Sequence, residues 1–100
     1  MRLGTVVGMV VSTVKEESLQ GLKLLVIEDC DVAGRGKGSY YVAADAVGAG
    51  KTEVVLTAHG SSARQTEATK NRPVDAVVMA IVEMIEAGGE VTYNKTQGEA

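Results

Sequence analysis

A chain of 100 residues has the length of one ordinary domain, and a fold of this size buries only about two thirds of the surface that its unfolded form exposes. Apolar residues make up 45% of it, but it has no Phe or Trp and only three Tyr, so we expect an aliphatic core. The net charge of −3 argues against an electrostatic nucleic-acid interface, and the single cysteine excludes an internal disulfide.

The first fourteen residues, MRLGTVVGMVVSTV, are rich in Val and Thr and predict an extended strand. Gly4 and Gly8 fall on the same side of this strand, where they suit a strong bend or a close backbone approach. Polar residues interrupt the apolar stretch and no small-residue cleavage site follows, so it is a poor match to a signal peptide. No run reaches the roughly 18 apolar residues that span a bilayer, and we expect no membrane partner.

The polar run KEESLQG predicts a turn before a second strand over residues 22–32. Alternation places these apolar residues on one face: Leu22, Leu24, Val26, Cys30 and Val32. Leu25 and Ile27 break the alternation, which predicts a strand covered on both sides for part of its length. The run AGRGKGS, residues 33–39, has three glycines and predicts a loop.

Two further strands are predicted over residues 40–47 and 52–59, and beyond them a serine of SSARQTEATKN is suited to cap a short helix. Residues 74–85 fit one helical face, yet six of these twelve residues are β-branched. The sequel favours a strand, because IVEMIE and EVTY are extended runs joined by a Gly-Gly turn.

Short strands at this spacing predict a mostly β fold: a small five-stranded OB-like barrel with one short helix and a C-terminal β extension. A closed barrel leaves no free sheet edge, which suits a chain with so many short strands. We expect a single domain over residues 1–94 and a polar C-terminal tail over residues 95–100.

The run GAGKT, residues 48–52, matches the end of a phosphate-binding loop. The complete pattern needs a glycine where this chain has Asp45, and it must open a helix, whereas the following EVVLTA is strand-like. The Asp45 carboxylate would also repel phosphate. We therefore interpret the run as a tight turn between two strands.

No constellation of catalytic or metal-binding residues emerges from the sequence. His59 is the only histidine, and with Cys30 it would make an incomplete zinc site, so we interpret Cys30 as a small buried apolar residue. GSSAR, residues 60–64, lacks the strand-turn-helix elbow of a serine nucleophile. Three acidic residues are interpreted as solvated loop or turn residues: Asp29, Asp31 and Asp45. We expect no enzymatic activity, no cofactor and no metal.

An OB-like barrel that binds single-stranded nucleic acid normally has aromatic stacking platforms in a basic groove. Tyr40 and Tyr41 are adjacent and would point to opposite faces of a strand, and Tyr93 stands alone. We therefore expect no nucleic-acid partner. A nucleic-acid or polyanion binding module remains the alternative function.

Five segments in chain order carry a resemblance to a known family. They are GMVVSTVK (8–15), LQGLKLLVI (19–27), VAADAVGAG (42–50), VVLTAHGSSAR (54–64) and PVDAVVMAIVE (73–83). Each motif alone is weak, but the five in register resemble the bacterial microcompartment vertex proteins, which include carboxysome and ethanolamine-compartment members. The resemblance extends from Met1 to about Tyr93.

This resemblance implies an OB-like barrel that forms a cyclic homopentamer and caps the vertices of a microcompartment shell in the bacterial cytoplasm. The implied partners are further copies of the chain and hexameric shell proteins. One local departure is Lys51-Thr52, because family members commonly have small or acidic residues after VGAG. This departure leaves the electrostatics of the pore or lumen open.

The candidate assembly contacts are small or polar residues of these motifs and one tyrosine: Ser12, Thr13, Lys15, Gly48, Ala49, Gly50, Ser61, Ser62, Ala63, Arg64 and Tyr93. Small residues allow close backbone approach, and Arg64 is suited to a forked bond to a carboxylate or carbonyl. The alternative is that GSSAR is merely a capped turn. Apolar residues on both faces of residues 22–27 and 77–85 exceed what a small barrel buries alone, and neighbouring subunits would cover the excess.

Overall fold

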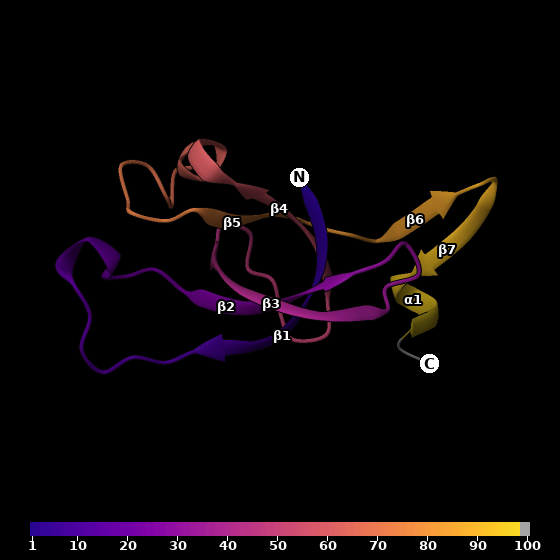
Figure 1. Ribbon diagram of the computed structural model, residues 1–100, viewed down its shortest axis with the longest axis horizontal. Helices are drawn as coiled ribbons and strands as arrows, with labels where there is room; N and C mark the ends of the chain where they lie inside the picture. The colour runs from indigo at the N-terminus through magenta and orange to yellow at the C-terminus, as the bar shows by residue number, and fades with distance from the viewer. Residues whose placement is uncertain (99–100) are drawn as a thin grey trace.

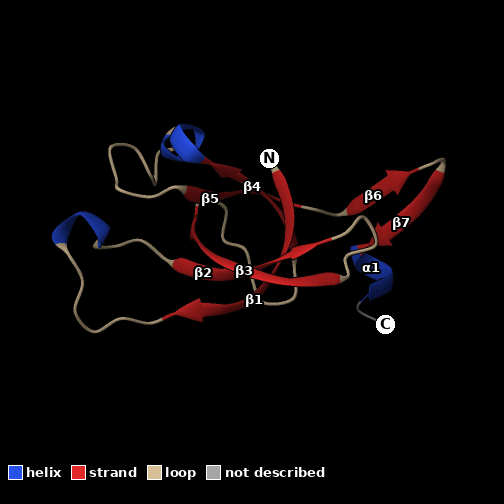
Figure 2. Ribbon diagram, viewed as in Figure 1, coloured by secondary structure: helices blue, strands red, loops and turns tan. Residues whose placement is uncertain are grey.

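Five strands of the structure, a computed structural model that describes residues 1–98, close into a barrel (Figure 1, Figure 2). They are β1 (Arg2–Val10), β2 (Leu24–Cys30), β3 (Gly36–Asp45), β4 (Val54–His59) and β5 (Ala76–Ile81). Their order round the barrel is β1-β2-β3-β5-β4, with β4 pairing back to β1. These neighbours are antiparallel except for β3 and β5. The predicted mostly β, five-stranded barrel is confirmed.

The two glycines of β1 serve the two purposes that the sequence left open. A Cβ atom at Gly4 would collide with the side chain of Ile27 on β2, so Gly4 permits a close approach between strands. Gly8 lies where the register of β1 against β2 shifts, and it has open space around it, as at a β-bulge. β1 ends at Val10, so residues 11–14 lie in the following loop.

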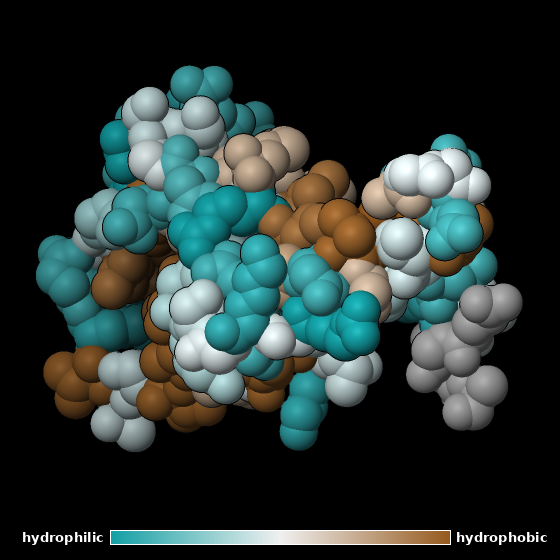
Figure 3. All heavy atoms as spheres, turned by 45° about the vertical axis from the view of Figure 1, so that its right-hand side comes forward, coloured by the Kyte–Doolittle hydropathy of each residue, from teal (hydrophilic) through white to brown (hydrophobic). Residues whose placement is uncertain are grey.

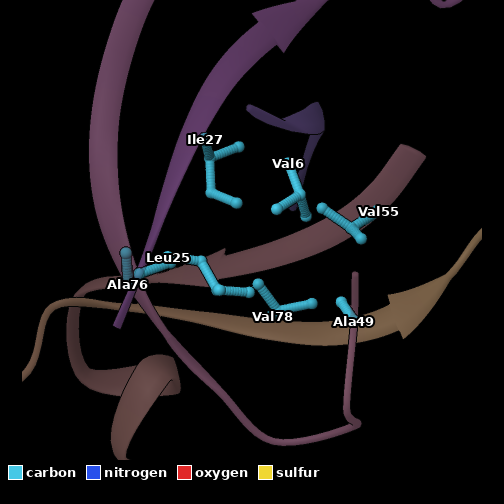
Figure 4. Packing of buried hydrophobic residues seen from close by; sticks show 8 residues of the cluster. Val6, Leu25, Ile27, Ala49, Val55, Ala76 and Val78 are labelled. Atoms are coloured by element: carbon cyan, nitrogen blue, oxygen red, sulfur yellow. The ribbon is translucent and has the colours of Figure 1, made fainter. Parts of the chain in front are cut away.

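The barrel interior is aliphatic, as the composition predicts (Figure 4). The buried cluster consists of Val6, Leu25, Ile27, Ala43, Ala49, Val55, Ala76 and Val78. All but Ala49 come from the five strands, and Ala49 reaches the cluster from the loop between β3 and β4. This loop is therefore part of the barrel core.

β2 is covered on both sides over part of its length, as the sequence predicts. Leu25 and Ile27 are 2% and 0% exposed and belong to the interior, whereas Leu24 and Val26 lie half-buried on the outside. Alternation in a sequence separates two faces of a strand but does not say which one meets the core. Cys30 is buried, as predicted.

The predicted loop over residues 33–39 is too long, because β3 already begins at Gly36. The turn before it is held by Asp31, whose Oδ1 accepts hydrogen bonds from the amides of Ala33 at 2.9 Å and Arg35 at 3.0 Å. Pairing with β2 across this tight turn overrides the low strand preference of glycine.

The predicted short helix is a 3-10 helix, η2 (Gly60–Arg64). Its N-cap residue is His59, which makes no side-chain capping bond, so the expected serine cap is wrong. Ala63 of η2 is completely buried in a second apolar cluster with Leu22, Ala44, Ala58 and Val77. A second 3-10 turn, η1 (Glu17–Leu19), lies in the loop between β1 and β2.

Residues 74–85 are extended, as the sequence favours, but they contribute to two strands. β5 ends at Ile81, and β6 (Met84–Ala87) then pairs with β7 (Glu90–Asn94) in a separate two-stranded sheet. The turn between them, residues 88–89, is Gly-Gly with positive φ at both positions. This β6–β7 hairpin is the predicted C-terminal extension, and it projects from the barrel along the 45 Å long axis of the molecule (Figure 1).

The predicted tail over residues 95–100 begins with one helical turn, α1 (Lys95–Gly98). The Lys95 amide donates a hydrogen bond of 2.9 Å to the carbonyl of Glu83, which fixes the turn to the base of the hairpin. Residues 99–100 lie outside the described residues. Within residues 1–98, no helix has the length and apolar character needed to cross a membrane.

Candidate assembly surfaces

Backbone amides of the turn that contains GAGKT bind the carboxylate of Asp45, which lies just before this run. Asp45 Oδ1 accepts hydrogen bonds from the amides of Val47 and Gly48 at 3.1 Å and from that of Ala49 at 3.3 Å. Thr52 has a φ of 77°, and β4 follows instead of a helix. The amides that would hold a phosphate already have an anionic partner, so the interpretation as a strand-connecting turn is consistent with the structure.

His59 belongs to a hydrogen-bonded chain on the barrel wall. Its Nε2 lies 2.8 Å from Thr57 Oγ1, which lies 2.7 Å from the Tyr41 hydroxyl, and its ring meets the Tyr41 ring edge to face at 4.9 Å. Burial lowers the pKa of His59, and the charge of Arg2 lowers it further. Residues 1–98 contain no group of three His, Cys, Asp or Glu side chains suited to hold a metal ion.

Asp29 does not match its interpretation as a solvated loop residue. It lies on β2, where its carboxylate accepts hydrogen bonds from Nε and Nη2 of Arg2 at 3.1 and 2.5 Å. The Ser39 hydroxyl donates a third hydrogen bond to it at 2.8 Å. The hydrogen bond from Arg2 holds the pKa of Asp29 below its usual value. The guanidinium also lies 4.6 Å from the centre of the Tyr41 ring, which makes Arg2 a clamp between β1, β2 and β3.

The segments VSTVK (residues 11–15) and GSSAR lie at the same end of the barrel (Figure 1). Arg72 connects their two loops, since its Nη1 donates to the carbonyls of Ser18 at 3.1 Å and Gln20 at 2.6 Å. Ser12 and Thr13 are exposed in the β1–β2 loop. Exposed apolar side chains accompany them: Met9, Val10, Val11 and Val14. The sequence motifs did not place these apolar side chains among the candidate contacts, although the apolar run that contains them is visible in the sequence.

The structure divides the remaining candidates into accessible and buried residues. Ser61, Ser62, Arg64 and Gly48 are exposed, and Gly50 and Lys15 are half-buried. Ala49 and Ala63 are completely buried within their own chain. Small residues in these motifs therefore serve internal packing as well as any contact with a neighbour.

Arg64 and Tyr93 already have partners within the chain. Arg64 Nη1 donates one bond of 3.2 Å to the carbonyl of Val74, in place of the forked bond that the sequence suggested. The Tyr93 ring packs so closely on Gly34 that a Cβ atom there would lie 2.8 Å from it. Tyr93 therefore fixes the hairpin to the β2–β3 turn, at the end of the barrel opposite to GSSAR (Figure 1).

Charged and polar contacts complete this attachment of the hairpin. Lys95 Nζ lies 2.6 Å from Glu53 Oε2, just before β4, and the hydrogen bond from Lys95 lowers the pKa of Glu53. The Thr92 hydroxyl donates to the carbonyl of Val32. Beyond these contacts the hairpin exposes about half of the Met84 and Val91 side chains, at 53% and 52%.

Uncovered apolar side chains thus occur at both ends of the molecule and on the sheet between them. On the sheet, Val42 and Tyr40 of β3 are exposed beside Val26 of β2. In Figure 3 apolar surface gathers at the lower left, where the β1–β2 loop runs, and between the barrel and the hairpin. Tyr40 is exposed and Tyr41 is half-buried, so the two rings do not form one stacking platform.

A closed OB-like barrel with separate apolar surfaces at its two ends defines a class of small β proteins suited to contacts with other protein subunits. Residues 1–83 match the family described as "Ethanolamine utilisation protein EutN/carboxysome". The chain belongs to this family.

Two relatives show how far the similarity extends. The chain is 47% identical over 97 residues to the carboxysome shell vertex protein CcmL of Synechococcus elongatus, covering 97% of this chain and 98% of that protein. It is 43% identical over 95 residues to the bacterial microcompartment shell vertex protein EutN of Salmonella typhimurium, covering 95% and 96%.

Solved structures agree with this assignment. The structure of Gloeobacter violaceus CcmL superimposes with a TM-score of 0.90 at 45% identity, covering 96% of this chain and 99% of the other. The GrpN pentameric microcompartment shell protein from Rhodospirillum rubrum superimposes with a TM-score of 0.79 at 46% identity, covering 87% and 99%. The resemblance inferred from the five sequence motifs is confirmed.

Proposed function

We propose that this protein is a vertex protein of a bacterial microcompartment shell, that it works as a cyclic homopentamer in the bacterial cytoplasm, and that its role is structural. The similarity to vertex proteins over almost the whole chain carries the proposal, because it includes both the barrel and the hairpin. The pentameric relative GrpN supports five as the number of copies. Hexameric shell proteins are the proposed neighbours of the ring.

The shape of the surface supports a ring. In a cyclic assembly one patch of each subunit meets a different patch of the next, so a subunit needs two dissimilar surfaces. The loop end of this barrel presents Val11 and Val14, while the hairpin end presents Met84 and Val91. Each end exposes apolar side chains that gain from being covered.

The mass of the purified protein under native conditions tests the ring directly. We expect five times the 10.4 kDa of one chain, by native mass spectrometry and by light scattering after gel filtration. A monomer at micromolar concentration would contradict the homopentamer. Retention of that monomer on a polyanion resin would instead support the alternative binding module.

Shell closure tests the vertex role separately. Co-expression with hexameric shell proteins should give closed icosahedral particles by electron microscopy only when this protein is present. An intact pentamer that fails to join such particles would contradict the vertex role and leave the ring standing.

Arg64 tests whether GSSAR takes part in assembly. If it contacts a neighbour, Arg64→Ala should weaken the ring or prevent shell closure. Arg35→Ala is the matched control, since Arg35 is an exposed arginine paired with Asp31 in the β2–β3 turn at the other end. Unchanged ring assembly and unchanged shell closure in Arg64→Ala would leave GSSAR as an internal turn.

A further inference from the structure

The outer face of the β6–β7 hairpin combines apolar and acidic side chains. Met84 and Glu86 alternate along β6, and Val91 is paired with Glu86 across the hairpin, so the three share one face. All three are exposed. Residues 83–94 include three glutamates and no lysine or arginine, which makes the hairpin negatively charged.

A pocket of about 140 Å³ on the barrel has the complementary character. It lies between the end of β1, the start of β2 and the β3–β4 loop, with Met9, Leu25 and Ala49 among its apolar lining. Two lysines also line it, Lys23 and Lys51. Both are exposed, and neither forms an ion pair with any residue of the described chain.

The size of the pocket suits one apolar side chain. Cavities of about 150 Å³ lined by aliphatic groups accept a ring as large as benzene, and a methionine side chain is flexible enough to fill an irregular space of that kind. Gly8 also lines the pocket, and a Cβ atom there would meet nothing within 4 Å, so this edge of β1 leaves room for an incoming side chain.

The hairpin of the same chain does not reach this pocket. Tyr93 and Lys95 hold the base of the hairpin against Gly34 and Glu53, and the ribbon extends away from the barrel (Figure 1). The end of β1 and the start of β2 lie on the other side of the molecule in the same view. An occupant that matches the pocket in charge and polarity must therefore come from another molecule.

We propose that the outer hairpin face docks on this pocket in a second copy of the chain, with Met84 in the pocket and Glu86 between Lys23 and Lys51. The inference rests on the proposed ring, for which it supplies one contact between neighbours. The contact joins two different patches, as a cyclic ring requires, and its repetition closes the ring when the rotation between neighbours is one fifth of a turn. Opposite charges fix the register of the contact, and the apolar side chains supply the burial.

Charge reversal and charge exchange test this contact. Glu86→Lys and Lys51→Glu should each raise the concentration at which the pentamer dissociates by at least about tenfold, because each brings like charges together. The double variant Glu86→Lys with Lys51→Glu should recover most of the lost affinity. Native mass spectrometry over a dilution series measures all three, and circular dichroism shows whether each chain is folded.

Glu90→Lys is the matched control. It makes the same charge change in the same hairpin, but Glu90 pairs with Ala87 and not with the face of Met84 and Glu86. We expect its pentamer to dissociate at the same concentration as the unchanged protein. Met84→Asp, which tests the pocket without altering a lysine, should weaken the ring at least as strongly as Glu86→Lys.

The experiments distinguish a failure of the proposed ring from a failure of the proposed docking contact. If the unchanged protein is a monomer, the ring itself is wrong. If it is a pentamer and a folded Glu86→Lys variant dissociates at the same concentration, the docking contact is wrong and the ring stands. A loss of affinity in both single variants without recovery in the exchanged pair would also overturn the contact.

Discussion

The barrel and the β6–β7 hairpin are both mainly antiparallel β structure, but they are stabilised in different ways. The barrel closes on itself and buries an aliphatic cluster in which Ile27 and Val55 have no exposed surface. The hairpin has two strands, half-exposed apolar side chains and an attachment made by Tyr93, Thr92 and Lys95. An isolated two-stranded sheet is only marginally stable in water. The comparison indicates that the barrel is stabilised by its own packing, whereas the hairpin leaves apolar side chains uncovered.

The largest effect should come from the barrel interior. Ile27→Ala removes a fully buried side chain and leaves a cavity, so we expect the free energy of unfolding to fall by about 2–5 kcal/mol in urea titrations. Val91→Ala, in the exposed face of the hairpin, should change the unfolding of the monomer by no more than about 0.5 kcal/mol. Equal losses in the two variants would contradict the division between barrel and hairpin.

The strand crossing at Gly4 should give the next largest effect. Gly4→Ala places a methyl group against Ile27 and the carbonyl of Glu28, and we expect a loss of about 1–3 kcal/mol from this overpacking. Gly8→Ala is the control on the same strand, where an added Cβ meets nothing within 4 Å. Thermal unfolding should separate the two variants, and a similar destabilisation in both would refute the assignment of a tight contact to Gly4 alone.

The attachment of the hairpin should contribute less to global stability. Glu53→Gln weakens the ion pair with Lys95, so we expect the free energy of unfolding to change by at most about 1 kcal/mol. The amides of β6 and β7 should exchange with deuterium faster, while those of the barrel keep their rates. Glu90→Gln, an exposed hairpin glutamate, serves as the control. Faster exchange throughout the barrel would show that the attachment supports the whole fold.

The same ion pair predicts a dependence on pH. The hydrogen bond from Lys95 lowers the pKa of Glu53 in the folded protein, so its stabilising contribution is complete above the usual glutamate pKa of 4.5. The contribution is lost as the pH falls below that value through the folded pKa. Chemical shifts of Tyr93 and Gly34 should follow this loss between pH 7 and 3, and Glu53→Gln should reduce the change. An identical titration in the variant would assign it to another group.

The smallest expected effect concerns Cys30. Burial raises the pKa of its thiol, so a thiol reagent should modify the folded protein slowly and the urea-unfolded protein at once. Because Cys30 lies in the barrel, Glu53→Gln should leave the rate of modification unchanged even when the hairpin is released. A faster reaction in this variant would mean that hairpin and barrel open together.

The sequence predicts the barrel well because alternation and turn residues are local signals. The Gly-Gly turn before β7 and the β-branched run of β5 were identified in this way. It predicts the start of β3 poorly, because a long-range partner, β2, holds Gly36 in a strand against its own preference. The inward side of β2 was also set by the rest of the sheet and not by the strand alone.

Among the site residues, exposure was the main property that the motifs did not reveal. Ala49 and Ala63 lie in segments interpreted as contact surfaces, yet both are fully buried in the subunit. The proposed docking contact combines Met9, Lys51 and Met84, which lie far apart in the sequence and are related only through the fold and a second copy. No local motif encodes such a combination.

The position of the hairpin after the barrel has a consequence for how freely each part can vary. Barrel closure requires β5, because β5 pairs with both β3 and β4, so every strand of the barrel lies within residues 2–81. Within the part of the chain that the structure describes, β6 and β7 pair only with each other and not with any strand of the barrel. A substitution on the outer face of the hairpin can therefore alter the surface offered to other molecules without interrupting a strand pair that closes the barrel.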